Sequence, residues 1–163
     1  MTQPTNTYAP FYLRRFDIAD VNDLYNALQD KRVVKHMATE GLSLKNCESI
    51  IRDSAKHWEK HGIGDYAVVD AKTGRIIGWA GFKHWENQEF ELLVVLSPQY
   101  WGLGKVIYYE LLNQAKSTFK LHELYVLLPK TRKSFRSIEK LGFRFCQTTI
   151  FNQESFLKFK ITL

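Results

Sequence analysis

The chain has 163 residues, of which 45% are hydrophobic and 14% aromatic, and its formal net charge is +6. This length supports one well-filled core and is too short for two ordinary domains. The 25% of charged residues is usual for a folded chain, which excludes extended disorder as a description of the whole sequence.

The N-terminal third predicts one strand followed by two helices. Residues 1–10 are polar and lack the apolar core of a signal peptide, so we expect a loose leader before a single domain over residues 11–163. The aromatic and aliphatic run 11–16 favours a strand. Apolar residues at three- and four-residue steps predict a helix over 21–28 and a second over 43–61. The residues expected on the buried face of the second helix are Ile50, Ile51, Ala55 and Trp58.

In the middle of the chain the pattern of apolar residues changes from that of helices to that of strands. Runs 66–70, 75–82 and 89–96 predict three successive antiparallel strands, with turn residues 71–74 between the first two. A helix is then expected over 102–118, because apolar residues recur at its helical spacing. The residues expected to face the sheet from it are Ile107, Leu111, Ala115 and Phe119.

The last third predicts a strand, a helix and two more strands. The strand covers 122–128, the helix covers 131–141 before Gly142, and the final strands cover 143–151 and 155–161. Antiparallel strands followed by alternating helices and strands are typical of the α+β class. The sequence therefore predicts one mixed, mostly antiparallel sheet flanked by helices.

The segment 91–105 is the most informative one, because an apolar strand there meets a glycine-punctuated turn and then a helix. Bare backbone N–H groups at a helix start, with Gly102 and Gly104 lacking side chains, form a site for a pyrophosphate-like anion. A Walker-type loop would need glycine at Gln99, and a dinucleotide fingerprint would need it at Ile107. Both of these phosphate loops are excluded.

The remaining pattern, Gln99-x-x-Gly102-x-Gly104, resembles the acyl-CoA pyrophosphate loop of the GNAT N-acetyltransferase superfamily. Further motifs resemble its branch of ribosomal-protein-alanine acetyltransferases (RimJ/RimL), in the same order and at the same spacing. These motifs are Leu13-Arg14-x-Phe16-x-x-x-Asp20, Ile77-Gly78, Glu91 ten residues before Trp101-Gly102, and Ser134 followed after five residues by Lys140-Leu141-Gly142-Phe143.

The resemblance implies the GNAT fold, with two central parallel strands that splay apart, and acetyl-CoA as cosubstrate without a metal. The backbone of residues 100–105 would hold the pyrophosphate and that of 93–96 the pantetheine arm. Thr131 stands where the family usually has asparagine, and Lys105 is either a phosphate contact or a plain exposed residue. The cofactor-binding residues implied are Leu93, Val94, Val95, Leu96, Gln99, Tyr100, Trp101, Gly102, Leu103, Gly104, Lys105, Thr131 and Ser134.

Acetyl transfer to an amine needs a base for the amine proton and a proton for the departing thiolate. The resemblance makes Glu91 the base, the alternative being a surface glutamate, and Ser134 the thiolate's proton donor, the alternative being a helix-capping serine. Ile138 occupies the position where many members have an acidic tyrosine. Water or another tyrosine such as Tyr125 could also return the proton, unless Tyr125 belongs to the core.

Several residues keep two interpretations at this level. The aromatic set could line an acceptor pocket or the core, and it consists of Trp79, Phe82, His84 and Trp85. The histidines without metal-ligand spacing, expected to be structural, are His36, His57, His61 and His122. Cys47 and Cys146 are far apart and are expected to be idle thiols.

The function predicted is an N-acetyltransferase acting on protein N-terminal α-amines or small-molecule amines. The alternative is a non-catalytic acyl-CoA-binding module. Basic residues are scattered, so no nucleic-acid partner is expected. No segment is long and apolar enough for a bilayer, so we expect no membrane partner and a cytoplasmic location. Dimers are common in similar proteins, which leaves a homodimer as one option.

Overall fold

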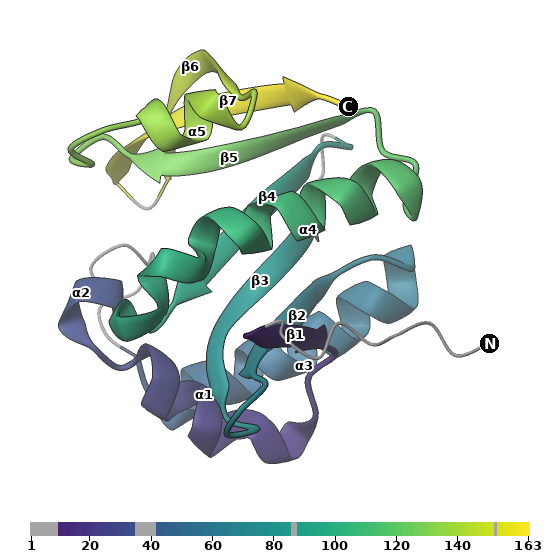
Figure 1. Cartoon of the computed structure of the whole chain (residues 1–163), viewed down its shortest axis with the longest axis vertical. Coiled ribbons are helices and arrows are strands. Elements are labelled where there is room, and N and C mark those ends of the chain that lie inside the picture. The colour runs from purple at the N-terminus through teal and green to yellow at the C-terminus, as the bar shows by residue number, and fades with distance from the viewer. Residues whose placement is uncertain (1–9, 35–41, 86–87, 152) are drawn as a thin grey trace.

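A seven-stranded sheet in the order β1-β2-β3-β4-β5-β7-β6 forms the centre of the computed structural model, which describes residues 10–34, 42–85, 88–151 and 153–163 (Figure 1). Only β4 and β5 run parallel among the paired neighbours. The expected α+β sheet is confirmed, whereas the expected leader lies almost wholly outside the described residues. The strands are β1 (Phe11–Arg14), β2 (Asp65–Asp70), β3 (Ile76–His84), β4 (Phe90–Leu96), β5 (Glu123–Pro129), β6 (Arg144–Phe151) and β7 (Glu154–Thr162).

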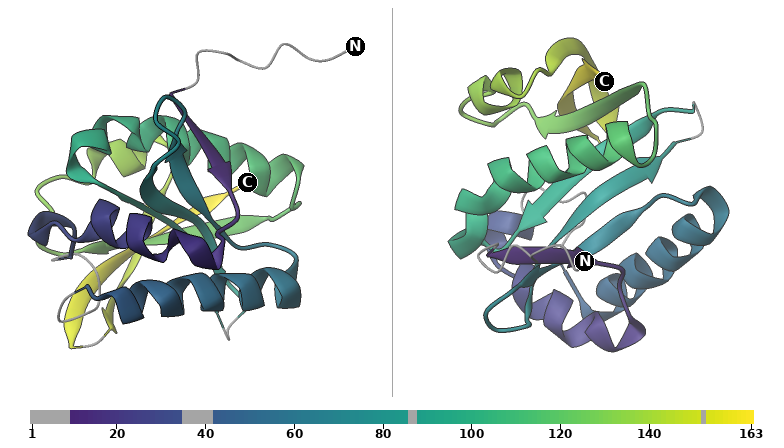
Figure 2. Two further views of the ribbon diagram at one scale, coloured as in Figure 1. Left: turned by 90° about the horizontal axis from the view of Figure 1, so that it is seen from below. Right: turned by 45° about the vertical axis from the view of Figure 1, so that its right-hand side comes forward.

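Helices cover both faces of the sheet, and Figure 2 shows α4 on the side opposite to α1 and α3. The helical elements are η1 (Ile18–Asp20), α1 (Val21–Leu28), α2 (Lys31–Val34), α3 (Leu44–His61), η2 (Pro98–Leu103), α4 (Gly104–Ser117) and α5 (Arg136–Lys140), where η marks a 3-10 helix. One core joins α4 and α5 to the sheet, and a second core joins α1, α2 and α3 to its other face. Within the described part of the chain, no helix combines the length and apolarity needed to span a bilayer.

Two predicted helices begin later than expected. The helix expected over 102–118 starts at Gly104, because residues 98–103 form the tighter η2 turn that Pro98 opens. The helix expected over 131–141 is confined to α5. Residues 130–134 are polar and fully exposed, so they offer no apolar face to pack against the sheet.

The buried face of α3 is shifted from the expected one. Ile51 and Trp58 are buried as predicted, but Ala55 is exposed, and Cys47 and Ser54 take the inner positions. Ser54 can lie inside because its hydroxyl donates to the buried Asp65 carboxylate.

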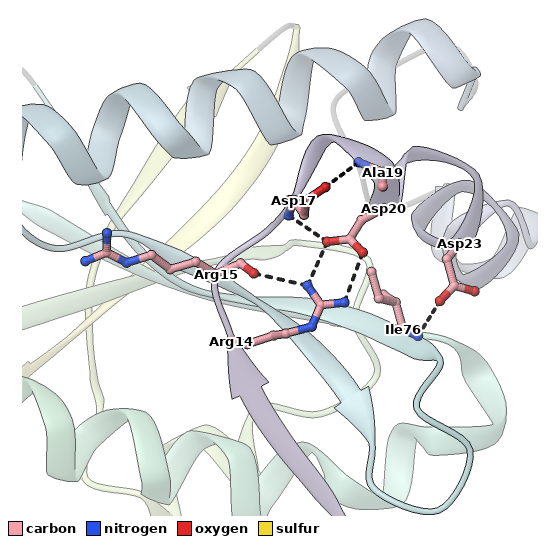
Figure 3. A network of polar contacts seen from close by, with 7 residues as sticks. All are labelled: Arg14, Arg15, Asp17, Ala19, Asp20, Asp23 and Ile76. Carbon is pink, nitrogen blue, oxygen red and sulfur yellow. Dashed lines mark hydrogen bonds and ion pairs between the residues drawn. The ribbon is translucent and has the colours of Figure 1, made fainter.

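The Arg14-to-Asp20 spacing of the opening motif has a structural cause, shown in Figure 3. The Arg14 guanidinium donates to both oxygens of Asp20, at 2.8 and 2.9 Å, and the Asp17 N–H donates to Asp20 Oδ2 at 2.7 Å. In the next turn Asp23 Oδ2 accepts from the Ile76 N–H of β3 at 2.7 Å. These bonds fix the chain between β1 and α1 and attach α1 to β3.

Replacing Asp20 by alanine is expected to lower the free energy of unfolding by about 2–3 kcal/mol, because a helix cap and a bidentate charged pair are lost together. Burial alone would raise the pKa of Asp20, but the bonds from Arg14 and the Asp17 N–H outweigh it and lower the pKa. The stabilisation is therefore present above the unfolded pKa of about 3.9 and is lost as the pH falls through the lower folded pKa. Urea unfolding of wild type and Asp20→Ala at pH 7 and pH 3 checks this, and an equal difference at both pH values contradicts it.

Candidate active site

Strands β4 and β5 are hydrogen-bonded neighbours at a single register position, Glu91 opposite Tyr125, near the start of both strands. Figure 1 shows them diverging from that point, with the first turn of α4 on the β4 side and α5 on the β5 side. The other edge of β4 is paired with β3 along its whole length, from Phe90 to Leu96. The expected splayed parallel pair is therefore confirmed.

The splay leaves main-chain groups of β4 without a strand partner. The Ser97 N–H, just after β4, donates to the Ile77 carbonyl of β3 at 2.9 Å. Because successive residues of a strand point their N–H and C=O groups to opposite sides, every second residue of β4 then faces away from β3. Four residues of β4 are expected to bind pantetheine. The main-chain N–H and C=O groups of Leu93 and Val95 point to β3, and those of Val94 and Leu96 point toward the side that β5 leaves open.

The turn after β4 is held in place by two side chains. The Tyr100 hydroxyl donates to Asp70 Oδ2 at 2.8 Å, and the Trp101 indole N–H donates to the Leu96 carbonyl at 3.0 Å. Some of the backbone N–H groups expected to bind pyrophosphate are engaged within the turn itself, since the Tyr100 N–H donates to the Ser97 carbonyl and the Gly104 N–H donates to the Trp101 carbonyl. The first turn of α4 has no side-chain cap and no acidic residue, which leaves its positive end available to an anion.

The fold itself does not require glycine at Gly102 or Gly104. A Cβ built at either position meets no atom within 4 Å, and neither residue has a positive φ. At Gly78, in contrast, the Cβ would lie 2.4 Å from the Val95 carbonyl oxygen. Bare backbone facing open space at a helix start is what close approach of a phosphate requires, so this turn fits the pyrophosphate of CoA.

Basic side chains lie beside the same turn. The Arg32 guanidinium is 5.7 Å from the Trp101 ring, and the Lys105 Nζ is 5.9 Å from the Tyr109 ring. Gln99 and Lys105 are exposed, and Leu103 is half-buried. The Arg32 guanidinium is paired with Asp30, so Lys105 is the one of these two cations that raises the potential around an anion at the start of α4.

Glu91 lies where β4 and β5 begin to diverge. One of its oxygens, Oε2, accepts a hydrogen bond of 2.8 Å from the indole N–H of Trp85. Burial raises the pKa of Glu91, and the Trp85 bond and the charge of Lys83, its cross-strand neighbour, oppose that rise. A carboxylate with a raised pKa is suited to accepting a proton near neutral pH.

Two tyrosines are close enough to Glu91 for its charge to raise their pKa values. Burial raises the pKa of Tyr108 in α4 to about 12, the charge of Arg132 opposes the rise, and that of Glu91 adds to it. Burial and then Glu91 also raise the pKa of Tyr125, which is nearly fully buried. Sequence reasoning missed Tyr108, although its spacing from Leu111, Leu112 and Ala115 on the apolar side of α4 was a usable signal.

Ser134 and Thr131 lie together on the exposed segment between β5 and α5. The Ser134 hydroxyl oxygen accepts from the Arg136 N–H at 3.2 Å, which leaves its own hydrogen free to be donated. Neither residue hydrogen-bonds to Glu91 within the described chain. Ile138 is buried in the core, so the position where the family usually has a tyrosine supplies no acid.

The four aromatic residues that could line either the acceptor pocket or the core take different places in the structure. Phe82 is in the core, the Trp79 indole donates to Asp65 at 2.5 Å, and only Trp85 reaches Glu91. The His84 ring packs at a tilt against His61, with ring centroids 4.5 Å apart, and the His61 ring also neighbours His57. Over the residues that the structure describes, no group of three or more potential ligands is arranged to hold a metal ion. His36 lies outside them.

Comparisons with known proteins agree with this geometry. Residues 11–144 match the family model described as the acetyltransferase (GNAT) domain. An acetyltransferase from Agrobacterium tumefaciens superposes with a TM-score of 0.75 at 21% identity, covering 92% of this chain and 89% of that one. A provisionally assigned ribosomal-protein-serine acetyltransferase from Vibrio cholerae gives 0.78 at 16% identity, covering 100% of both chains.

A third similar structure contains ligands. It is spermidine N-acetyltransferase from Vibrio cholerae in complex with CoA and spermine, with a TM-score of 0.73, 17% identity, and coverage of 94% of this chain and 95% of that one. At these identities the structural likenesses show the fold, and the family model carries the assignment. The chain belongs to the GNAT acetyltransferase family and is an acetyl-CoA-dependent N-acetyltransferase.

Proposed function

We propose that this enzyme transfers the acetyl group of acetyl-CoA directly to an amine, with Glu91 as the general base. The observation that carries the proposal is the position of Glu91 at the divergence of β4 and β5, with a raised pKa and one oxygen held by Trp85. Bound acetyl-CoA supplies an activated acetyl thioester. Glu91 would accept the proton of the attacking amine, directly or through a water molecule.

The residues proposed to hold the cosubstrate come from two adjacent elements. The open edge of β4, at Val94 and Leu96, would bind the amides of the pantetheine arm as an added strand. The η2 turn and the start of α4, from Gln99 to Lys105, would bind the pyrophosphate through backbone N–H groups. Thr131 and Ser134 would contact the arm from the β5 side.

The acceptor proposed is a protein N-terminal α-amine or a small-molecule amine, as in the RimJ/RimL branch. The likeness to a ribosomal-protein-serine acetyltransferase agrees with the first class, and the likeness to spermidine N-acetyltransferase with the second. The net charge of +6 argues against a polycationic acceptor. We further propose one domain over residues 11–163 and a cytoplasmic location.

A panel of acceptors tests the proposed function. CoA release is measured with acetyl-CoA and spermidine, free amino acids, or peptides that differ in their N-terminal residue. We expect turnover with a monoamine or a peptide N-terminus, and none with the same peptide after its N-terminus is blocked. Tight acetyl-CoA binding without turnover of any amine would instead favour a non-catalytic binding module.

Ser134 is proposed to return the proton to the CoA thiolate, because its hydroxyl hydrogen is free for donation. Ser134→Ala is expected to lower kcat about tenfold and to leave the Kd of acetyl-CoA within about twofold. Steady-state kinetics and calorimetry on the variant check this. Tyr108→Phe is the matched comparison, and a larger fall in kcat for Tyr108→Phe than for Ser134→Ala assigns the acid to Tyr108.

A further inference from the structure

Trp85 is the one described residue that hydrogen-bonds to the Glu91 side chain, through a donor that has no acceptor capacity. Its backbone closes the connection between β3 and β4, since Trp85 N–H donates to the Glu89 carbonyl at 2.9 Å and the Trp85 carbonyl accepts from Gln88 N–H at 3.0 Å. The base of the side chain is therefore fixed by the hairpin on which Glu91 lies.

The indole ring is held from two further directions. Phe151, at the end of β6, packs edge-on against it with ring centroids 6.2 Å apart. The Nζ of Lys83, a residue of β3, lies 4.3 Å from the centroid of the Trp85 ring. Aromatic packing and a cation over the ring restrict the orientation of the indole, so its N–H is directed at Glu91 before any substrate binds.

The hydrogen bond from Trp85 gives the two oxygens of the Glu91 carboxylate different surroundings. Oε2 accepts the indole N–H, whereas Oε1 has no hydrogen-bond partner among the described residues. No side-chain oxygen in that part of the chain is both fully buried and unpartnered, so Oε1 remains reachable by solvent or by an amine. One oxygen is thus a fixed anchor and the other is free for proton transfer.

We infer that Trp85 is a positioning residue for acetyl transfer, which anchors Glu91 Oε2 so that Oε1 faces the acceptor amine. This inference rests on the proposed role of Glu91 as base. The other charged or titratable groups that face Glu91 are Lys83 on β3, Tyr108 on α4 and Tyr125 on β5, with the Glu89–Lys158 ion pair beyond Tyr125. Within the described part of the chain none of these groups donates a hydrogen bond to the Glu91 carboxylate, whereas Trp85 does.

The wild-type protein provides a test that needs no acceptor. In ¹⁵N-labelled protein, the indole N–H resonance assigned to Trp85 is followed from pH 4 to pH 9. We expect it to titrate with one midpoint above the ordinary range of glutamate, about 4.3, and to lose this titration in Glu91→Gln. A Trp85 resonance that shows the same pH dependence in Glu91→Gln overturns the anchoring bond, whatever the catalytic role of Glu91.

Kinetics of Trp85→Phe then test the consequence for catalysis. The phenyl ring keeps a partner for Phe151 but lacks the indole N–H donor. Because that bond lowers the pKa of Glu91, the acid limb in the pH profile of kcat/KM is expected to move up by about one pH unit. The plateau of the profile is expected to fall about tenfold. Trp79→Phe is the matched control, because it removes another indole bond to a carboxylate, the one from Trp79 on β3 to Asp65 on β2. Trp79→Phe is expected to lower Tm without moving the acid limb of the pH profile of kcat/KM.

The outcomes separate the two levels of the hypothesis. An unshifted acid limb and full activity in Trp85→Phe, together with an inactive Glu91→Gln, reject the role of Trp85 and keep the proposed function. Full activity in Glu91→Gln rejects the base assignment and the positioning role together.

Discussion

Glu91→Gln is expected to lower kcat/KM for the best amine acceptor by about 100- to 1000-fold, the usual contribution of a general base. Wild-type activity should fall as the pH drops through the pKa of Glu91, because only the ionised carboxylate accepts a proton. Burial raises that pKa, so the fall begins at a higher pH than for an exposed glutamate. This acid limb is expected to be missing from the pH profile of the variant.

The stability of Glu91→Gln distinguishes loss of a base from loss of the fold. A carboxyl group whose folded pKa is raised weakens the folded state at pH values above its unfolded pKa. Removing the charge should therefore leave Tm at pH 7 unchanged or slightly higher. The control is Glu123→Gln, which makes the same change at an exposed glutamate on β5 and is expected to retain kcat/KM within about twofold. A comparable loss of activity in both variants would falsify the assignment.

The sequence predicted elements best where the apolar period was long and the ends carried strong signals. The helix expected over 43–61 is an example, because Ser43 caps α3 with its hydroxyl and Gly62 ends the helix with a φ of 67°. The helix start at 131 was wrong because Gly142 marked only the end of α5. Residues 130–133 offer no apolar side chain to hold a first turn, and the motif resemblance carried no information about helix length.

The site was predicted unevenly for a similar reason. Glu91 and the glycines lie on one continuous segment, so their spacing could be read directly, and the structure places them along the same strand and turn. The neighbours of Glu91 come from β3, α4 and β5, and their meeting depends on strand order and register. Trp85 was left open between pocket and core, because the direction of its indole N–H is set by Phe151, 66 positions later in the sequence.

The second large effect is expected at the turn before α4. Gly104→Val and Gly102→Val should each raise the Kd of acetyl-CoA by about 100-fold, because a side chain there fills the space through which a phosphate reaches the backbone. Loss of one or two hydrogen bonds to a charged group, each about 1.5–3 kcal/mol, accounts for this size. Isothermal titration calorimetry with acetyl-CoA measures it without any acceptor.

Substitution of either glycine is expected to spare the fold, which makes a loss of acetyl-CoA binding interpretable. Neither glycine is crowded or has a positive φ, so Gly104→Ala at the helix start should raise the free energy of unfolding by about 0.5–1 kcal/mol. Gly74→Ala is the matched control, since its Cβ also meets open space but its φ is 73°. That variant should lose stability and keep the wild-type Kd. Wild-type affinity in Gly104→Val would show that the pyrophosphate does not rest on this turn, because the added side chain would stand in the space that the phosphate needs.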